Sequence, residues 1–199
     1  MDPSAPDIKD LEDQLDAAER DARALVADLA EERGGWRGKN GSWSVGECLD
    51  HVATANRAYL QAMKEPAIRA HQQGRLRRRP AAPGFVGRWF VKTLEPPVKA
   101  AFRMKAPRTI EPRTMPPLAD AFASFRTSQD EVREFLRAYA DLDLAAVRFP
   151  NPFIRGIRFS VATGLHVILA HERRHLWQAW RIRRAAEDAA VQVSQANVS

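Results

Sequence analysis

Two histidines one helical turn apart are the residues of this chain with the clearest chemical potential. His171 and His175 stand in the run AHERRHLWQAW, and a third histidine, His51, lies far upstream in SWSVGECLDHV. Side chains at positions i and i+4 lie on the same helix face, close enough for two imidazole nitrogens to bind one ion. A zinc-type ion with three protein ligands keeps a position open, which is typical of catalytic sites. The spacing therefore indicates metal chemistry.

An ordinary structural role is the alternative for these histidines, because a His-x3-His pair alone is weak evidence for a metal. The helix face that carries the pair is otherwise largely apolar and is expected to point inward: Gly164, Ile168, His171, His175, Gln178 and Ile182. The intervening Glu172, Arg173 and Arg174 are expected to face solvent. Burying two imidazoles without partners would cost roughly 1 to 3 kcal/mol each. A bound metal would remove that cost.

Four other residues have weaker claims on the site. Glu47, one turn before the upstream histidine, could accept a hydrogen bond from a ligating ring or from a metal-bound water, but Ser44-x-x-Glu47 is also typical of a helix capping box. We favour the capping role. Cys48 could be a fourth ligand, although a small core residue is the simpler interpretation. His166 points away from the face of the pair, and His71 lies in a basic connection, so neither is a favoured ligand.

The elements that must position these residues are predicted to be helices. Apolar residues recur at helical spacing in four segments, at about residues 7–32, 44–64, 117–140 and 161–188. Pro66 is expected to end the second helix, and Ser160 to cap the last one. Residues 66–116 are rich in proline and form a long connection. The sequence thus predicts an all-α fold, an antiparallel four-helix bundle with a long crossover between its second and third helices, in a single domain over residues 1–199.

Composition excludes several classes of protein. One cysteine in 199 residues excludes an intrachain disulfide and a cysteine-based zinc cage. No stretch approaches the roughly 20 apolar residues of a membrane span, and the first residues lack the pattern of a secretory signal. No phosphate-binding glycine loop, dinucleotide fingerprint or Ser-His-Asp order is present. We expect a soluble, cytoplasmic protein.

Basic charge is concentrated in the connection. The net charge is +6, yet the segment from Arg69 to Arg108 holds eleven Lys or Arg and a single acid, Glu95, a balance of +10 that leaves −4 for the rest. Residues 85–94 have the spacing of a short helix lying on the bundle, whereas residues 148–159 could be extended. Binding to nucleic acid or another anionic surface is a second hypothesis, with Trp89 and Phe90 among the cations. We favour the simpler interpretation, in which the aromatics pack on the bundle and the arginines stay solvated.

The two histidine motifs together resemble those of the DinB-like superfamily. WSVGECLDHV at 43–52 is similar to its second-helix signature, and HERRHLWQ at 171–178 is similar to its final-helix His-x3-His followed by Gln. Residues 94–97 and 105–107 resemble one branch of the family, and the likeness extends over about residues 8–185. The resemblance implies a four-helix bundle with a long crossover and a divalent metal, commonly zinc or nickel, whose ligands would be His51, His171 and His175. It also implies pairs of subunits and thiol-dependent transferases or isomerases that act with low-molecular-weight thiols.

The expected function is that of a metal-dependent enzyme, a thiol transferase or a hydrolase, with a small-molecule substrate. Three neutral imidazoles leave the ion its full positive charge, so it can lower the pKa of a bound water or thiol. A metal-binding bundle without turnover is the alternative, and a fourth ligand such as Cys48 would favour it. No residue identifies the substrate or a catalytic acid or base.

Overall fold

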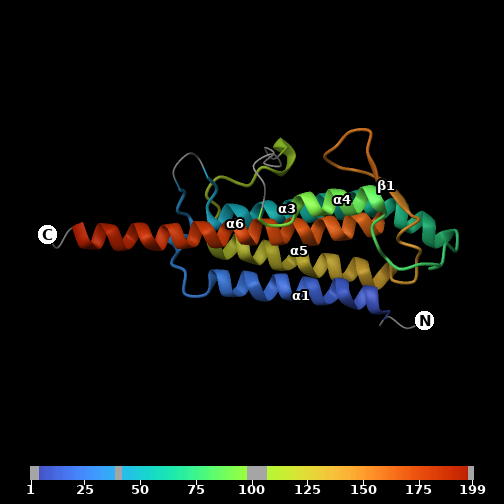
Figure 1. Ribbon diagram of the computed structural model, residues 1–199, viewed down its shortest axis with the longest axis horizontal. Coiled ribbons are helices and arrows are strands. Elements are labelled where there is room, and N and C mark those ends of the chain that lie inside the picture. The colour runs from blue at the N-terminus through green and yellow to red at the C-terminus, as the bar shows by residue number, and fades with distance from the viewer. Residues whose placement is uncertain (1–4, 39–41, 98–106, 197–199) are drawn as a thin grey trace.

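Four long helices run along the length of the molecule in a computed structural model that describes residues 5–38, 42–97 and 107–196 (Figure 1). These are α1 (Pro6–Val26), α3 (Val45–Gln72), α5 (Leu118–Tyr139) and α6 (Val161–Ala196). A long crossover joins α3 to α5 and contains α4 (Phe85–Leu94) and the 3-10 helix η3 (Arg108–Ile110). The predicted all-α bundle with a long crossover is confirmed. Lys99, Arg103 and Lys105 of the predicted basic connection lie outside the described residues.

The first predicted helix ends earlier than its apolar pattern suggested. α1 ends at Val26 and not near residue 32, and a separate short helix, α2, covers Glu31–Gly34. Asp28 between them has a φ of 55°, a left-handed conformation that ends a right-handed helix and that Asp adopts more readily than most residues. The break lets Leu29 reach the buried apolar cluster beside α1.

The second predicted helix is longer than its proline suggested. α3 continues to Gln72 with Pro66 inside it, although the proline lacks the N–H that would bond to the preceding turn. Ala67 and Ala70, which follow the proline, are both buried in the core. Their burial offsets the lost hydrogen bond, so packing overrides the local signal. The last helix also runs past its predicted end near residue 188, to Ala196, because no Pro or Gly interrupts it.

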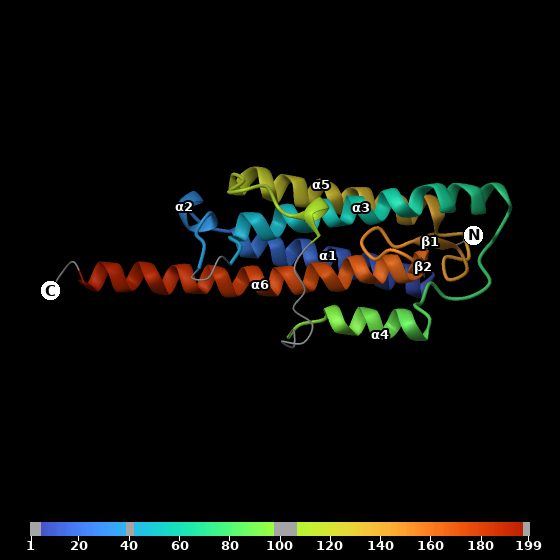
Figure 2. The same ribbon diagram turned by 90° about the horizontal axis from the view of Figure 1, so that it is seen from above.

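The short helix predicted at residues 85–94 is present as α4. Figure 2 shows that α4 lies beside α6, outside the four long helices. A Cβ at Gly87 would lie 2.6 Å from Thr163 Oγ1, so the absence of a side chain permits this close approach to α6. Phe90 packs on Phe159 with ring centroids 5.1 Å apart. α4 is therefore held to the first turn of α6 and to the strand before it.

The segment before α6 is extended, as predicted. β1 (Arg148–Pro150) pairs antiparallel with β2 (Arg158–Ser160), with Phe149 opposite Phe159. Ser160 Oγ accepts a hydrogen bond of 3.1 Å from the Thr163 N–H, which confirms its capping role. In the described part of the chain, no helix is both long and apolar enough to cross a membrane.

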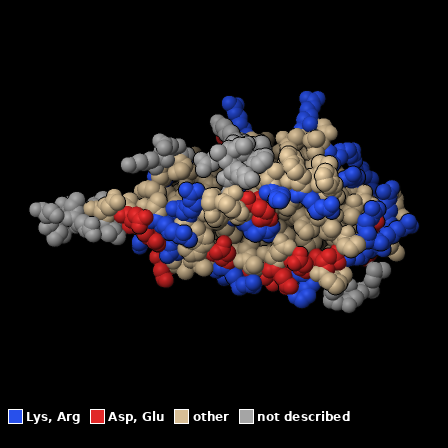
Figure 3. All heavy atoms as spheres, viewed as in Figure 1, with Lys and Arg blue, Asp and Glu red and all other residues tan. Residues whose placement is uncertain are grey.

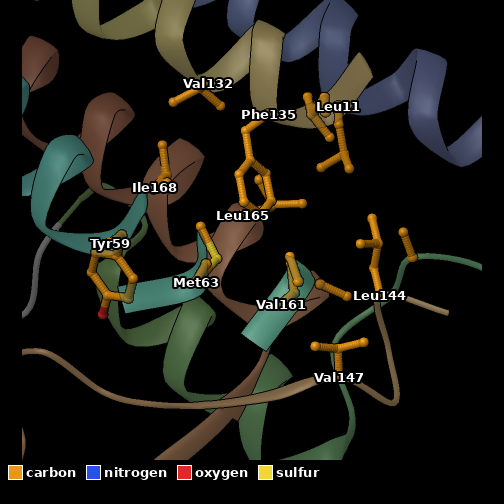
Figure 4. Close-up of a cluster of buried hydrophobic side chains, with 14 of the residues drawn as sticks. Leu11, Tyr59, Met63, Val132, Phe135, Leu144, Val147, Val161, Leu165 and Ile168 are labelled. Atoms are coloured by element: carbon orange, nitrogen blue, oxygen red, sulfur yellow. The ribbon is translucent and has the colours of Figure 1, made fainter. Parts of the chain in front are cut away.

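The core consists of two apolar clusters stacked along the bundle axis. The first surrounds Met63 of α3, Phe135 of α5 and Leu165 of α6, and Figure 4 shows these side chains pointing toward one another. The second surrounds Leu49 of α3 and Phe125 of α5. Between the two clusters lies a layer of polar side chains, which we call the polar layer: Asn56, Ser128, Gln129, His171, Glu172 and His175. The candidate site is built on this layer.

Candidate metal centre

Helices α3 and α6 bring the three predicted histidines together. His51 comes from the second turn of α3, and His171 and His175 come from one face of α6. One ligand atom from each ring lies within 4.8 Å of the others. The ring centroids of His51 and His175 are 4.5 Å apart, as are those of His171 and His175. The cluster is a possible metal site.

Hydrogen bonding determines which nitrogen of His51 faces the cluster as a free lone pair. His51 Nδ1 lies 2.6 Å from the Ile110 carbonyl oxygen, which only accepts, so Nδ1 carries the proton and donates. His51 Nε2 is then unprotonated and lies 3.2 Å from His171 Nε2. Two ligands held at 2.0–2.1 Å on a tetrahedral ion lie about 3.3 Å apart. This pair is therefore already spaced as two ligands of one ion.

An ion pair between Asp50 and Arg113, which we call the Asp50 clamp, holds the Ile110 carbonyl in place. Asp50 accepts hydrogen bonds of 2.8 Å from the backbone N–H of Arg113 and from its Nε, and the side chain of Asp50 is buried. This ion pair ties the end of the crossover to α3 one residue before His51. The Ile110 carbonyl, which orients the His51 ring, is thus held by Asp50, the residue that precedes His51 in sequence.

Burial keeps all three rings in their neutral form at neutral pH. Desolvation lowers the pKa of His51, in spite of the hydrogen bond to Ile110, which acts in the opposite direction. Desolvation and the neighbouring imidazoles hold the pKa values of His171 and His175 well below the usual range. Metal binding requires neutral imidazole, so the cluster needs no deprotonation step near pH 7.

One buried nitrogen of the cluster has no partner. His175 Nδ1 is shielded from solvent and makes no hydrogen bond within the part of the chain that the structure describes. Leaving such a group unsatisfied costs about 1 to 3 kcal/mol. The donor set is three neutral imidazoles, which suit Zn, Ni, Cu and Fe alike. The residues present therefore fit a divalent ion, without selecting one.

A pocket of about 1070 Å³ opens beside the histidines. Its lining includes apolar side chains of α3, α4, α6 and the β1–β2 loop, namely Tyr59, Phe90, Leu94, Phe153 and Val167. Three tryptophans, Trp36, Trp43 and Trp177, and several arginines also line it. Trp43 stacks on His175 at a centroid distance of 5.7 Å. Apolar walls with a few polar groups are typical of small-molecule sites.

Glu47 has both carboxylate oxygens engaged away from the histidines. The capping box is present: the Ser44 N–H donates to Glu47 Oε2 at 2.8 Å, and the Glu47 N–H donates to Ser44 Oγ at 3.1 Å. Arg37 forms a two-pronged ion pair with the same carboxylate. Burial alone would raise the pKa of Glu47, but Arg37 and the Ser44 N–H lower it overall. These contacts give Glu47 a helix-starting role.

The remaining candidates lie outside the cluster. Cys48 is buried in the apolar cluster around Leu49, and burial raises the pKa of its thiol. His166 Nε2 is 3.1 Å from the Ala81 carbonyl oxygen. His71 lies 3.8 Å from an oxygen of Asp141. The structure brings none of these side chains to the three histidines.

Glu172 was wrongly expected to face solvent. Its side chain is completely buried in the polar layer, where Oε1 accepts hydrogen bonds from Asn56 Nδ2 at 2.8 Å and from Gln129 Nε2 at 2.6 Å. Burial raises its pKa to about 7, although the two amides lower it. Three buried oxygens, Asn56 Oδ1, Gln129 Oε1 and Glu172 Oε2, have no partner among the described residues.

The error about this part of α6 comes from its position in the bundle. α6 contacts α1, α3 and α4 on different sides, so it has no wide solvent face at this level. Arg173 is also only half-exposed: it pairs with Glu95 and donates to Gln14 Oε1 at 2.8 Å. The sequence of α5 did carry a sign of a buried polar partner. Gln129 stands four residues after Phe125 and three before Val132, so it is a polar residue on the apolar stripe.

The fold and the site together define a class: a four-helix bundle whose long crossover closes over a three-histidine cluster beside a pocket. A family model described as the DinB superfamily matches residues 14–179, and the chain belongs to that superfamily. This confirms the resemblance carried by the two histidine motifs, and the histidine cluster fits a metal-binding family. No curated protein and no solved structure matches the chain.

Proposed function

We propose that His51, His171 and His175 hold one divalent ion, zinc or nickel, and that the chain is a metal-dependent enzyme, a thiol transferase or a hydrolase acting on a small molecule. The observation that carries this proposal is the convergence of three neutral imidazoles on the wall of a large pocket. A divalent ion supplies a positive charge that acidifies a water or a thiol. The side chains around the cluster provide the orientation of its three rings.

The residues around the cluster act by orienting it. Ile110 accepts from His51 Nδ1 and leaves Nε2 available, and the Asp50 clamp on Arg113 keeps that carbonyl in reach. Trp43 packs against both His51 and His175 and limits their rotation. Ligands held in this way lose little freedom on binding, which strengthens the site.

The pocket favours a catalytic metal site over a purely structural one. A structural ion is closed by a fourth protein ligand, whereas a catalytic ion faces open space. Cys48 packs among apolar side chains of α3 and α5, away from the ligand atoms. A pocket of this size beside the cluster can take a small molecule. These observations favour catalysis over the alternative of a metal-binding bundle without turnover.

Metal analysis tests the site. Protein purified without a histidine tag and supplied with zinc or nickel should carry about one ion per chain by mass spectrometry of the metals. The double variant His171→Ala, His175→Ala should carry almost none. His166→Ala removes a histidine of the same helix outside the cluster and should keep the metal. Equal metal content in the wild type and the double variant would show the ligand assignment to be wrong.

Turnover is tested separately on the same samples. Metal-loaded wild type should consume thiols in the presence of a small electrophile, or cleave activated esters or amides, and the double variant should not. Chelation followed by readdition of zinc or nickel should abolish and then restore that rate. Stoichiometric metal with no turnover in either assay would support the non-catalytic alternative.

A further inference from the structure

Helix α4 presents a second apolar side that nothing in the described structure covers. Phe85 is 80% exposed, Val86 68% and Trp89 59%, and residues at i, i+1 and i+4 lie on one side of a helix. The opposite side, with Phe90 and Leu94, packs on the core. The expectation that the aromatics of this segment pack on the bundle is therefore right for Phe90 and wrong for Trp89. α4 carries more apolar surface than its packing uses.

The chain that contains α4 and the segment on which α4 packs are strongly basic. Residues 75–92 and 144–160 contain nine Lys or Arg and no acid. The residues just before the second segment contact the first: the Arg77 N–H donates to the Asp141 carbonyl at 2.7 Å and the Asp143 N–H donates to the Arg75 carbonyl at 3.1 Å, so two acids lie at this junction. Figure 3 shows Lys and Arg side chains gathered at the end of the molecule that carries β1.

Most of these cations have no acidic partner. Arg77 pairs with Asp7, and Arg79 pairs with Asp143. Within the described ranges, the other seven form no ion pair: Arg75, Arg78, Arg88, Lys92, Arg148, Arg155 and Arg158. Two of the seven donate a side-chain hydrogen bond to a backbone carbonyl, Arg88 to Pro83 and Arg158 to Arg148. The side chains of the other five donate none within the described ranges.

We propose that Phe85, Val86 and Trp89, together with the seven cations just named, form a surface that binds an anionic lipid membrane. We call this surface the α4 face. Trp, Phe and Val side chains beside Lys and Arg are the composition of helices that lie in the plane of a membrane interface. The apolar side chains enter the interface, and the cations remain at the level of the anionic headgroups. This binding does not depend on the proposed metal.

Charge and shape favour a membrane over two other occupants. A second copy in a two-fold dimer would place the same cations opposite one another, and like charges across an interface are unfavourable. A nucleic acid would use the cations and one stacked aromatic, but it has no use for Phe85 and Val86, the most exposed apolar side chains of the helix. A lipid surface uses the cations and all three apolar groups.

Docking would also bring the candidate site close to the lipid. Phe90, the next residue after the exposed Trp89, and Leu94, one turn further on, line the pocket beside the histidines. α4 is therefore at once the outer apolar surface and a wall of that pocket. A substrate that dissolves in the membrane would meet the pocket at this helix.

Vesicle flotation tests the proposal. The full chain at low salt should float with vesicles that contain 30% phosphatidylglycerol in phosphatidylcholine, and much less with pure phosphatidylcholine. Phe85→Ser with Trp89→Ser should lower the partition coefficient at least about tenfold, since burial of apolar groups drives insertion. Arg78→Ser with Lys92→Ser should lower it by about fivefold for each charge removed, and added salt should act in the same direction.

The control removes the same charge elsewhere. Arg20→Ser with Arg184→Ser takes two cations from exposed positions outside the two basic segments and should bind like the wild type. All the altered side chains are exposed, so circular dichroism and melting should be unchanged. Absence of flotation at low salt, or equal flotation of the Phe85, Trp89 variant, would overturn the proposal. It would also be overturned by dimerisation through this face, or by oligonucleotide binding that needs the cations and not Phe85, in protein that does not float.

Discussion

Two polar clusters occupy adjacent positions of α6 and face opposite environments. His171 and His175 turn toward the pocket, where His171 is only partly buried, whereas Glu172 between them is completely buried against α3 and α5. Both clusters lie in the polar layer between the two apolar clusters. Both contain groups without a protein partner, namely His175 Nδ1 and Glu172 Oε2.

The difference between them is access to a ligand. An ion in the pocket would satisfy the imidazoles, because all three histidines line that pocket. Glu172 is completely buried and does not line the pocket beside the histidines, so its carboxyl is satisfied by the amides of Asn56 and Gln129. We therefore expect substitutions at Glu172 to change stability and substitutions of the histidines to change metal binding.

The largest expected effect is on folding, at Glu172. Glu172→Ala leaves the buried Gln129 Nε2 without its acceptor and Asn56 Nδ2 with only Ser128 Oγ, and it opens a cavity. We expect it to destabilise the metal-free protein by about 3 kcal/mol. Glu172→Gln keeps the shape and one acceptor oxygen, so its cost should be less than about 1 kcal/mol. Urea unfolding followed by circular dichroism measures both values.

His171→Ala in the same metal-free background is the matched comparison. It removes a polar ring from the edge of the pocket and should change the free energy of unfolding by less than about 1 kcal/mol. If His171→Ala proved as costly as Glu172→Ala, the histidines would be structural members of the core and the contrast between the clusters would fail.

The next effect is stabilisation by metal. Zinc or nickel at a free concentration 100 times its dissociation constant should stabilise the wild type by about 2.7 kcal/mol, because the ion binds the folded state. The His171→Ala, His175→Ala variant should gain nothing, whereas Glu172→Gln should gain as much as the wild type. The shift of the urea midpoint on metal addition reports this. Equal stabilisation of the double variant would mean that the ion binds elsewhere.

The sequence predicted the bundle and the histidine pair because both depend on local spacing. His-x3-His puts two rings on one face, and the capping box places His51 in the second turn of α3, but the joining of His51 to the pair was implied by the family resemblance. The extension of α3 through Pro66 and the break after Val26 depend on contacts with other helices, which periodicity does not contain. Glu172 was missed for the same reason, since only the neighbours of α6 decide that this side is buried.

Removal of Asp50, which helps to orient His51, should have a smaller effect, and only on metal affinity. Asp50→Ala releases Arg113 and frees the Ile110 carbonyl that orients His51 Nδ1, so we expect metal affinity to fall about tenfold, equivalent to about 1.4 kcal/mol. Isothermal titration with zinc measures it. Asp143→Ala removes a comparable buried acid that pairs with Arg79, far along the chain from Ile110, and should leave the affinity unchanged. Equal losses in both variants would attribute the effect to general destabilisation.

The smallest effect is expected at Cys48, the residue that separates a closed metal site from an open one. Its thiol is buried among apolar side chains, and burial raises its pKa, so it stays protonated, a form that does not bind metal. Cys48→Ala should therefore cost about 1 kcal/mol of stability through lost packing and leave the metal content at the wild-type value. Metal analysis beside urea unfolding separates the two. Loss of the ion in Cys48→Ala would mean that the thiolate reaches it, which would turn the three-histidine site facing a pocket into a closed, structural one.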